Sequence, residues 1–241
     1  VALTIDSGGV VNLQQNQGVV TVSGLTINNL NEGSKFNIGN GSVVIAYTNG
    51  VSPQSTIRSY IQAGFDNFNW DGPGITSSVA QADAANPGSS PYGGVAAIGY
   101  ADNSDLGRTD IPGNSVLVRF TYYGDADLNG VVDLNDFDDW LYGFTGGQLA
   151  DGGNGWANGD FDYDGTVDLN DFDLWLAGFT SGLGSLSTLD HAIDVSTLSS
   201  SQKTQLLDIV SSVPEPASFS LLAAGTIGLL SRRRRKVARK N

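Results

Sequence analysis

Two twelve-residue segments, 35 positions apart, repeat one pattern of carboxylates, glycine and valine. Loop 1 covers residues 125–136 and loop 2 covers residues 160–171. Each has oxygen-bearing side chains at positions 1, 3, 5, 9 and 12, a glycine at position 6 and a valine at position 8. Calcium takes six to eight oxygen ligands at about 2.3–2.6 Å, and its loop turns sharply at the glycine. The pattern therefore predicts two calcium-binding loops.

An apolar stripe follows each loop at helical spacing. Its members are Leu134, Phe137, Trp140, Leu141 and Phe144 after loop 1, and Leu169, Phe172, Trp175, Leu176 and Phe179 after loop 2. We expect each helix to end near a glycine, Gly143 or Gly178. Neither loop is preceded by a helical pattern, whereas an ordinary EF-hand has a helix on both sides.

This duplicated loop-and-helix unit, over residues 124–180, resembles the type I dockerin repeat. The resemblance implies two Ca²⁺ ions, two antiparallel helices, a β-bridge between Val132 and Val167, and, in cellulosomal members, a surface that binds cohesin. Cohesin-binding members often carry small hydroxyl residues at loop positions 10 and 11, where both repeats here have Leu-Asn. The ligands carried over by position are Asp125, Asp127, Asn129, Asp133 and Asp136 in loop 1, and Asp160, Asp162, Asp164, Asp168 and Asp171 in loop 2, with main-chain carbonyls from Val131 and Thr166.

The charge of the loops makes a cation necessary in this interpretation. Loop 1 gathers four carboxylates and loop 2 gathers five. Close pairs repel by roughly 1–4 kcal/mol, depending on the effective dielectric constant. We expect loop 2 to bind calcium more tightly, because it has Asp164 where loop 1 has Asn129. An acid-rich linker is the alternative, but a linker has no reason to keep glycine and valine in register.

Charge is distributed unevenly along the chain. Residues 1–216 hold all 25 acidic side chains and only five basic ones, while the last 25 residues hold seven basic side chains and no acid. An acidic body disfavours nucleic acid as a partner, because phosphate contacts need a cationic face. Four acids outside the loops are isolated candidates for catalysis, Asp66, Asp71, Asp102 and Asp105, and no pairing between them is predicted. We therefore predict that the chain is not an enzyme.

The first 122 residues are predicted to be mainly β, with a short helix. Short strands separated by Gly and Asn turns are typical of the end of a parallel β-helix or of a β-sandwich. The chain does not begin with Met, so we expect a fragment or processed product in which this part ends a larger β-solenoid. The expected strands cover 19–23, 25–28, 43–47, 95–100 and 115–123, and the expected helices cover 52–64 and 80–85.

Phe65, Phe68 and Trp70 lie close together in a Gly/Asn/Asp-rich stretch. They could form a sugar-stacking platform, or an aromatic plug between helix and sheet. We favour the plug, because aromatic side chains are usually buried.

The C-terminal residues have three parts: Pro214, Glu215 and Pro216, then an apolar run at 217–230, then a basic cluster. This order resembles the PEP-CTERM sorting signal. The resemblance implies recognition by an exosortase-like enzyme, transient anchoring in the inner membrane through a C-terminal transmembrane helix, and removal of the tail. A plain tail anchor and a nucleic-acid patch are the alternatives. The basic cluster is Arg232, Arg233, Arg234 and Arg235.

The predicted organisation is a β-rich domain (1–122), a dockerin-like domain (123–181), a linker with a short helix at 201–210 (182–212) and the sorting segment (213–241). It resembles surface proteins of Planctomycetes-type bacteria with autotransporter-like β-helices. We expect a non-catalytic, exported cell-surface or matrix protein. The alternatives are a docking module for a cohesin-like protein and the C-terminal accessory part of a carbohydrate-active enzyme. A surface polysaccharide is a further candidate partner.

Overall fold

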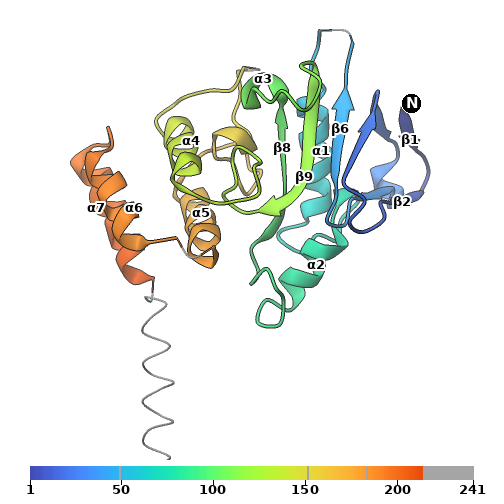
Figure 1. Cartoon of the computed structure of the whole chain (residues 1–241). Helices are drawn as coiled ribbons and strands as arrows, with labels where there is room; N and C mark the ends of the chain where they lie inside the picture. Colours follow the sequence, from blue (N-terminus) through green and yellow to red (C-terminus); the bar gives the residue numbers. More distant parts are fainter. Residues whose placement is uncertain (49, 151, 183, 214–241) are drawn as a thin grey trace, which may run out of the picture. The chain divides into compact units, whose positions relative to one another are not determined.

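The computed structural model describes residues 1–48, 50–150, 152–182 and 184–213 (Figure 1). The chain divides into two compact units, Val1–Ser185 and Leu186–Asn241. The boundary predicted between residues 122 and 123 falls inside the first unit, so the β-rich part and the two loops belong to one compact unit.

The first six strands stack as two successive turns of the chain. Partner residues lie 22 to 25 positions apart, so each strand pairs with the strand one turn later. Asn side chains form a ladder beside the strands, in which Asn37 Nδ2 donates to Asn12 Oδ1 at 2.9 Å and Asn40 Nδ2 donates to Asn16 Oδ1 at 2.7 Å. The parallel pairs are β1 (Leu3–Ile5) with β4 (Leu25–Ile27), β2 (Val10–Asn12) with β5 (Lys35–Asn37), and β3 (Val19–Val22) with β6 (Ser42–Ala46).

The remaining strands add both parallel and antiparallel pairs, and together with the helices they make a mixed α/β architecture. β7 (Gly74–Thr76) pairs in parallel with β5, whereas β9 (Ser115–Tyr122) lies antiparallel between β6 and β8 (Ala96–Asp102). Every predicted strand is present, with ends shifted by a residue or two. The parallel pairing of the first six strands differs from the antiparallel sheets of the sandwich alternative.

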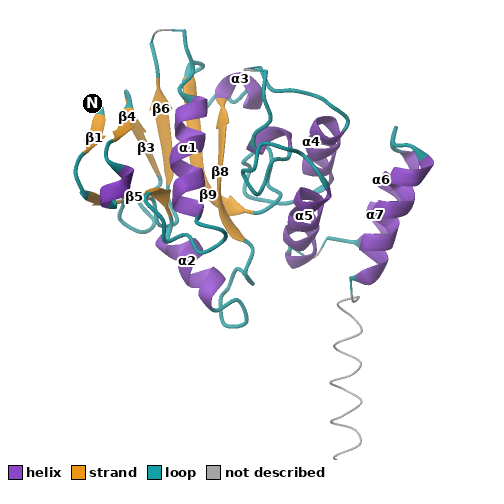
Figure 2. Cartoon of the chain, turned by 180° about the vertical axis from the view of Figure 1, so that it is seen from behind, coloured by secondary structure: helices purple, strands orange, loops and turns teal. Residues whose placement is uncertain are grey.

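Helices cover the sheets and connect them. α1 (Gln54–Phe65) buries Ile57 and Ile61 and lies over the sheet, roughly along its strands, in the rear view (Figure 2). α2 (Ser78–Ala85) is capped by Ser77, whose hydroxyl accepts from Ala80 N. Both helices were predicted. The one-turn elements α3 (Asn103–Leu106) and η1 (Leu30–Glu32) were not, because a single turn leaves no periodic pattern to detect.

The aromatic cluster at the end of α1 is mostly buried in the core. Phe65 and Trp70 are buried, and Phe68 is 40% exposed. The Phe65 ring contacts Phe68, Trp70 and, at a centroid distance of 4.9 Å, Tyr163 of loop 2. This arrangement is the aromatic plug that the sequence favours.

α4 (Leu134–Phe144) and α5 (Leu169–Ser181) follow the loops as predicted. α4 ends one residue after Gly143, as expected, whereas α5 continues for three residues beyond Gly178. A Cβ atom on Gly143 would lie 2.0 Å from the Asn158 carbonyl oxygen, and one on Gly178 would lie 2.0 Å from the Tyr123 carbonyl oxygen. Each glycine therefore lets its helix touch the chain that enters the opposite loop.

The expected β-bridge between the loops is not formed. Within the described residues, no backbone hydrogen bond joins Val132 to Val167, and both positions lie outside strands and bridges. Both side chains are buried instead, and they lie beside Gly178 and Gly143, respectively. The two repeats are thus joined by helix-to-loop packing.

The second unit contains α6 (Leu186–Val195) and α7 (Ser200–Ser212), which contact each other. α7 corresponds to the short helix predicted at 201–210, and α6 was not predicted within the linker. Among the helices of the described ranges, none combines the length and apolar character that crossing a bilayer requires. The transmembrane segment predicted within 213–241 lies outside the described residues, apart from Val213.

Replacing Gly143 or Gly178 by Ala should destabilise the protein by about 1–3 kcal/mol, because each methyl group would meet a backbone carbonyl that cannot move away. Urea denaturation measures the loss. Gly113→Ala is the matched control, because a Cβ there meets no atom within 4 Å. Equal stabilities for all three variants would contradict the close helix-to-loop packing.

Candidate metal centre

Each loop brings three carboxylates to a common point. Within the described residues, carboxylate oxygens of Asp125, Asp127 and Asp136 lie within 4.8 Å of one another in loop 1. Those of Asp160, Asp162 and Asp164 do so in loop 2. The other predicted carboxylate ligands do not join these groups: Asp133 in loop 1, and Asp168 and Asp171 in loop 2.

The last Asp of each loop is fixed by the backbone of its own loop. Asp136 Oδ1 accepts from Ala126 N at 2.8 Å, and its Oδ2 accepts from Asp133 N at 2.8 Å. Asp171 repeats these bonds with Phe161 N at 2.7 Å and Asp168 N at 2.9 Å. Because each carboxylate joins the start of its loop to the start of its helix, it fixes the loop's closed shape.

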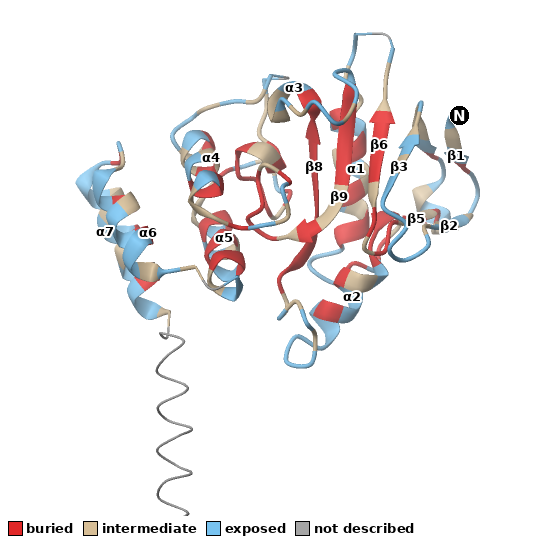
Figure 3. Cartoon of the chain, viewed as in Figure 1, coloured by how far each residue is buried: buried red, intermediate tan, exposed pale blue. Residues whose placement is uncertain are grey.

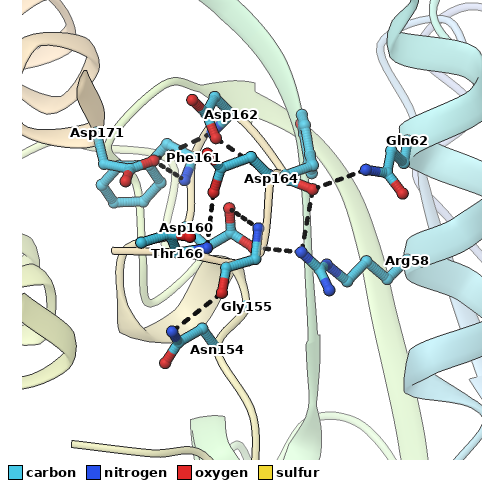
Figure 4. Close-up of polar contacts among 12 residues, drawn as sticks. Arg58, Gln62, Asn154, Gly155, Asp160, Phe161, Asp162, Asp164, Thr166 and Asp171 are labelled. Carbon is cyan, nitrogen blue, oxygen red and sulfur yellow. Dashed lines mark hydrogen bonds and ion pairs between the residues drawn. The ribbon is translucent and has the colours of Figure 1, made fainter. Parts of the chain in front are cut away.

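The first Asp of each loop is also fully buried and held by hydrogen bonds. Asp125 accepts from Thr121 Oγ1 and, at 3.0 Å, from Gly130 N. Asp160 accepts from Gly165 N and forms an ion pair with Arg58 Nη2 at 2.8 Å (Figure 4). The glycine at position 6 has a positive φ in both loops, 95° and 94°, which explains why both repeats have glycine there.

Positions 3, 5 and 9 order the rest of each loop through short turns. In loop 2, Asp162 Oδ1 accepts from Asp164 N, and Asp164 Oδ1 accepts from Thr166 N. Asp133 and Asp168 cap α4 and α5, with Asp133 Oδ1 accepting from Asn135 N at 2.7 Å. The carboxylates at position 9 are therefore the N-caps of the two helices.

The electrostatics of the loops favour a cation. Burial raises the pKa of Asp136 and of Asp171 to about 8, and that of Asp125 and of Asp160 to about 6. Neighbouring carboxylates in the same loop raise these pKa values further. Ionising these side chains in the folded protein is costly unless a positive charge joins them. An oxygen-only donor set with backbone carbonyls nearby suits a hard cation such as Ca²⁺.

Sequence reasoning missed the arginines that contact the loops. Arg58 on α1 and Arg119 on β9 donate to carbonyls of loop 2 and loop 1, respectively. Arg108 also donates to loop 1. These are three of the five basic residues in the first 216 positions. That scarcity was the available signal, because a rare cation in an acidic body tends to lie near the densest negative charge.

Residues 212–236 match the PEP-CTERM protein-sorting motif, which includes all seven predicted sorting residues. The motif indicates an exported protein that is targeted to an exosortase and sorted at the membrane. Comparison with curated proteins and with solved structures gave no match. Residues 214–236 of the matched stretch lie outside the described residues.

The metal-free protein should lose stability as the pH rises from 5 to 8. The pKa of Asp136 and Asp171 is about 8 in the folded protein and about 3.9 in an unfolded chain. The folded state therefore holds protons that the unfolded state releases, and the stabilisation present below pH 4 is lost as the pH rises towards 8. Melting temperatures in chelator, measured across this range, provide the test.

The double variant Asp136→Asn/Asp171→Asn is the control, and its melting temperature should depend less on pH. A wild-type melting temperature that rises from pH 5 to pH 8 in chelator would show that these carboxylates are not held in a desolvated site.

Proposed function

We propose that the chain is a non-catalytic, exported cell-surface or matrix protein, stabilised by two calcium ions and sorted through its tail. The observation that carries the calcium proposal is the repeated burial of the first and last Asp of each loop: Asp125, Asp136, Asp160 and Asp171 are at most 1% exposed. Carboxylates are almost never buried to this degree without a partner charge, and among the described residues only Asp160 of these four has one, Arg58.

The calcium-bound loops would form a dockerin-like module. Support comes from the duplicated loop, the single helix after each loop and the cross-packing of α4 and α5 on the opposite loop entrances. Two groups of residues would supply oxygen ligands, Asp125, Asp127 and Asp136 in loop 1 and Asp160, Asp162 and Asp164 in loop 2. Asp171 would serve loop 2 as Asp136 serves loop 1, because both accept equivalent backbone hydrogen bonds.

The first two turns of strands would form part of a parallel β-helix. Their support is the parallel pairing of three strands with the next three in the same order. Asp102, an acid outside the loops, has a structural role that fits a non-catalytic body: it caps α3 and accepts hydrogen bonds from Tyr47 and Ser52.

Calcium titration of the full chain by calorimetry should give two bound ions per chain. Asp136→Asn and Asp171→Asn should each reduce the number to one, because each removes a charge from one loop. Asp138→Asn and Asp173→Asn are matched controls, because these exposed acids stand two residues further along the same helices. Two ions in every variant, or none in the wild type, would overturn the proposal.

The tail would be recognised at Pro214, Glu215 and Pro216 and held by its apolar run, with the arginines kept on the cytoplasmic side. Replacing these three residues by Ala should leave the uncleaved chain in the membrane fraction of a host that has an exosortase, because the recognition motif is gone. Immunoblots of membrane and surface fractions measure this. Identical processing of wild type and variant would exclude a role for the motif.

A further inference from the structure

The same carbonyl in each loop accepts hydrogen bonds from the β-rich part of the first unit. Position 4 is Leu128 in loop 1 and Tyr163 in loop 2. The Leu128 carbonyl accepts from Arg119 Nη1 at 2.5 Å and from Arg108 Nη1 at 3.3 Å. The Tyr163 carbonyl accepts from Arg58 Nη2 at 3.0 Å and from Gln62 Nε2 at 3.1 Å (Figure 4). Two unrelated elements, β9 and α1, thus make equivalent contacts to the two repeats.

The side chains at position 4 anchor both loops to one strand. Leu128 and Tyr163 are fully buried and have positive φ values of 58° and 64°. A Cβ atom on Gly99 of β8 would lie 2.3 Å from Leu128 Cδ2. Tyr163 Oη donates to the carbonyl of Ile98, the neighbouring residue of β8, at 2.8 Å. All seven residues of β8 are buried (Figure 3), and the loops contact two of them, Ile98 and Gly99.

The arginines also lie against the turn that closes each loop. A Cβ atom on Gly130 would lie 2.8 Å from Arg119 Nη2, and one on Gly165 would lie 2.9 Å from Arg58 Nη2. These glycines are the residues whose N–H groups bind the first Asp of each loop. Gly130 therefore lies between the Arg119 guanidinium and the Asp125 carboxylate. Gly165 lies beside both the Arg58 guanidinium and the Asp160 carboxylate, which also contact each other directly.

We infer that Arg119 and Arg58 are positioning residues that couple ion binding in the two loops to the order of β8 and the sheet around it. This inference rests on the proposed calcium sites. Each arginine binds the outer side of the closed loop, and the ion would bind its inner side. Because both bind the same closed conformation, arginine contact and ion binding stabilise each other. Without the ion, repulsion among the carboxylates opens the loop, withdraws the position-4 carbonyl from its arginine and exposes β8. Calcium then stabilises the β-rich part, and the order of β8 in turn raises the affinity of the loops for calcium.

Hydrogen exchange of the full chain, with calcium and with chelator, tests the coupling directly. Calcium should slow amide exchange in β8 and β9, which contain none of the proposed ligands. Arg119→Gln and Arg58→Gln should each weaken calcium binding at one loop by about 10- to 100-fold, the range for residues that orient metal ligands. Each should also reduce the calcium-dependent protection of β8.

Two controls separate the possible failures. Lys35→Gln removes a cation that donates to the Asp71 carbonyl and not to either loop, so calcium affinity and protection should remain at wild-type values. Arg119→Lys keeps the charge and loses the paired donors, so it should bind calcium less tightly than wild type even if Arg119→Gln fails to fold.

Three results are informative. Absence of calcium binding by the wild type would overturn the proposed function itself. Two bound ions with unchanged exchange of β8 would leave that function intact and overturn the coupling. Wild-type affinity in both Arg119→Lys and Arg58→Gln would overturn the positioning role of the arginines.

Discussion

The first unit depends on carboxylates that are buried at the start and end of each loop. Asp125 with Asp136, and Asp160 with Asp171, lie inside the protein, where burial raises the pKa of all four side chains. Hydrogen-bond donors satisfy these carboxylates, but among the described residues only Asp160 also has a charged partner, Arg58. A bound cation, as proposed above, would make the ionised loops compatible with burial.

The two loop-and-helix repeats pack against each other to form one structure. A twelve-residue loop with one helix is too small to bury its own apolar face. Here each helix covers the entrance of the opposite loop, at the contacts that Gly143 and Gly178 permit. Phe137, Trp140, Phe172 and Trp175 fill the space between the repeats. Leu128 and Tyr163 of the loops contact β8, so loops, helices and sheet share one core.

Local pattern was sufficient for the local features. The loops and the helices after them follow from fixed spacings, and every predicted strand is present. The features that were missed depend on contacts between distant segments. Arg58 lies 102 positions from Asp160, and no local period connects them. Gly143 and Gly178 were identified as glycines near helix ends, but no local pattern indicated their close approach to a distant backbone. The bridge between Val132 and Val167 was assigned by resemblance, and the side chains pack under the glycines instead.

The most direct measurement is the melting temperature of the full chain at neutral pH, in calcium and in chelator. An ion that binds only the folded protein stabilises it by RT ln(1 + [L]/Kd), so the melting temperature should rise steadily with calcium concentration above Kd. The signal of the buried tryptophans of the first unit, followed by near-ultraviolet circular dichroism, reports on the relevant core. Equal melting temperatures in calcium and in chelator would contradict the account, because the buried carboxylates would then be balanced without a metal ion.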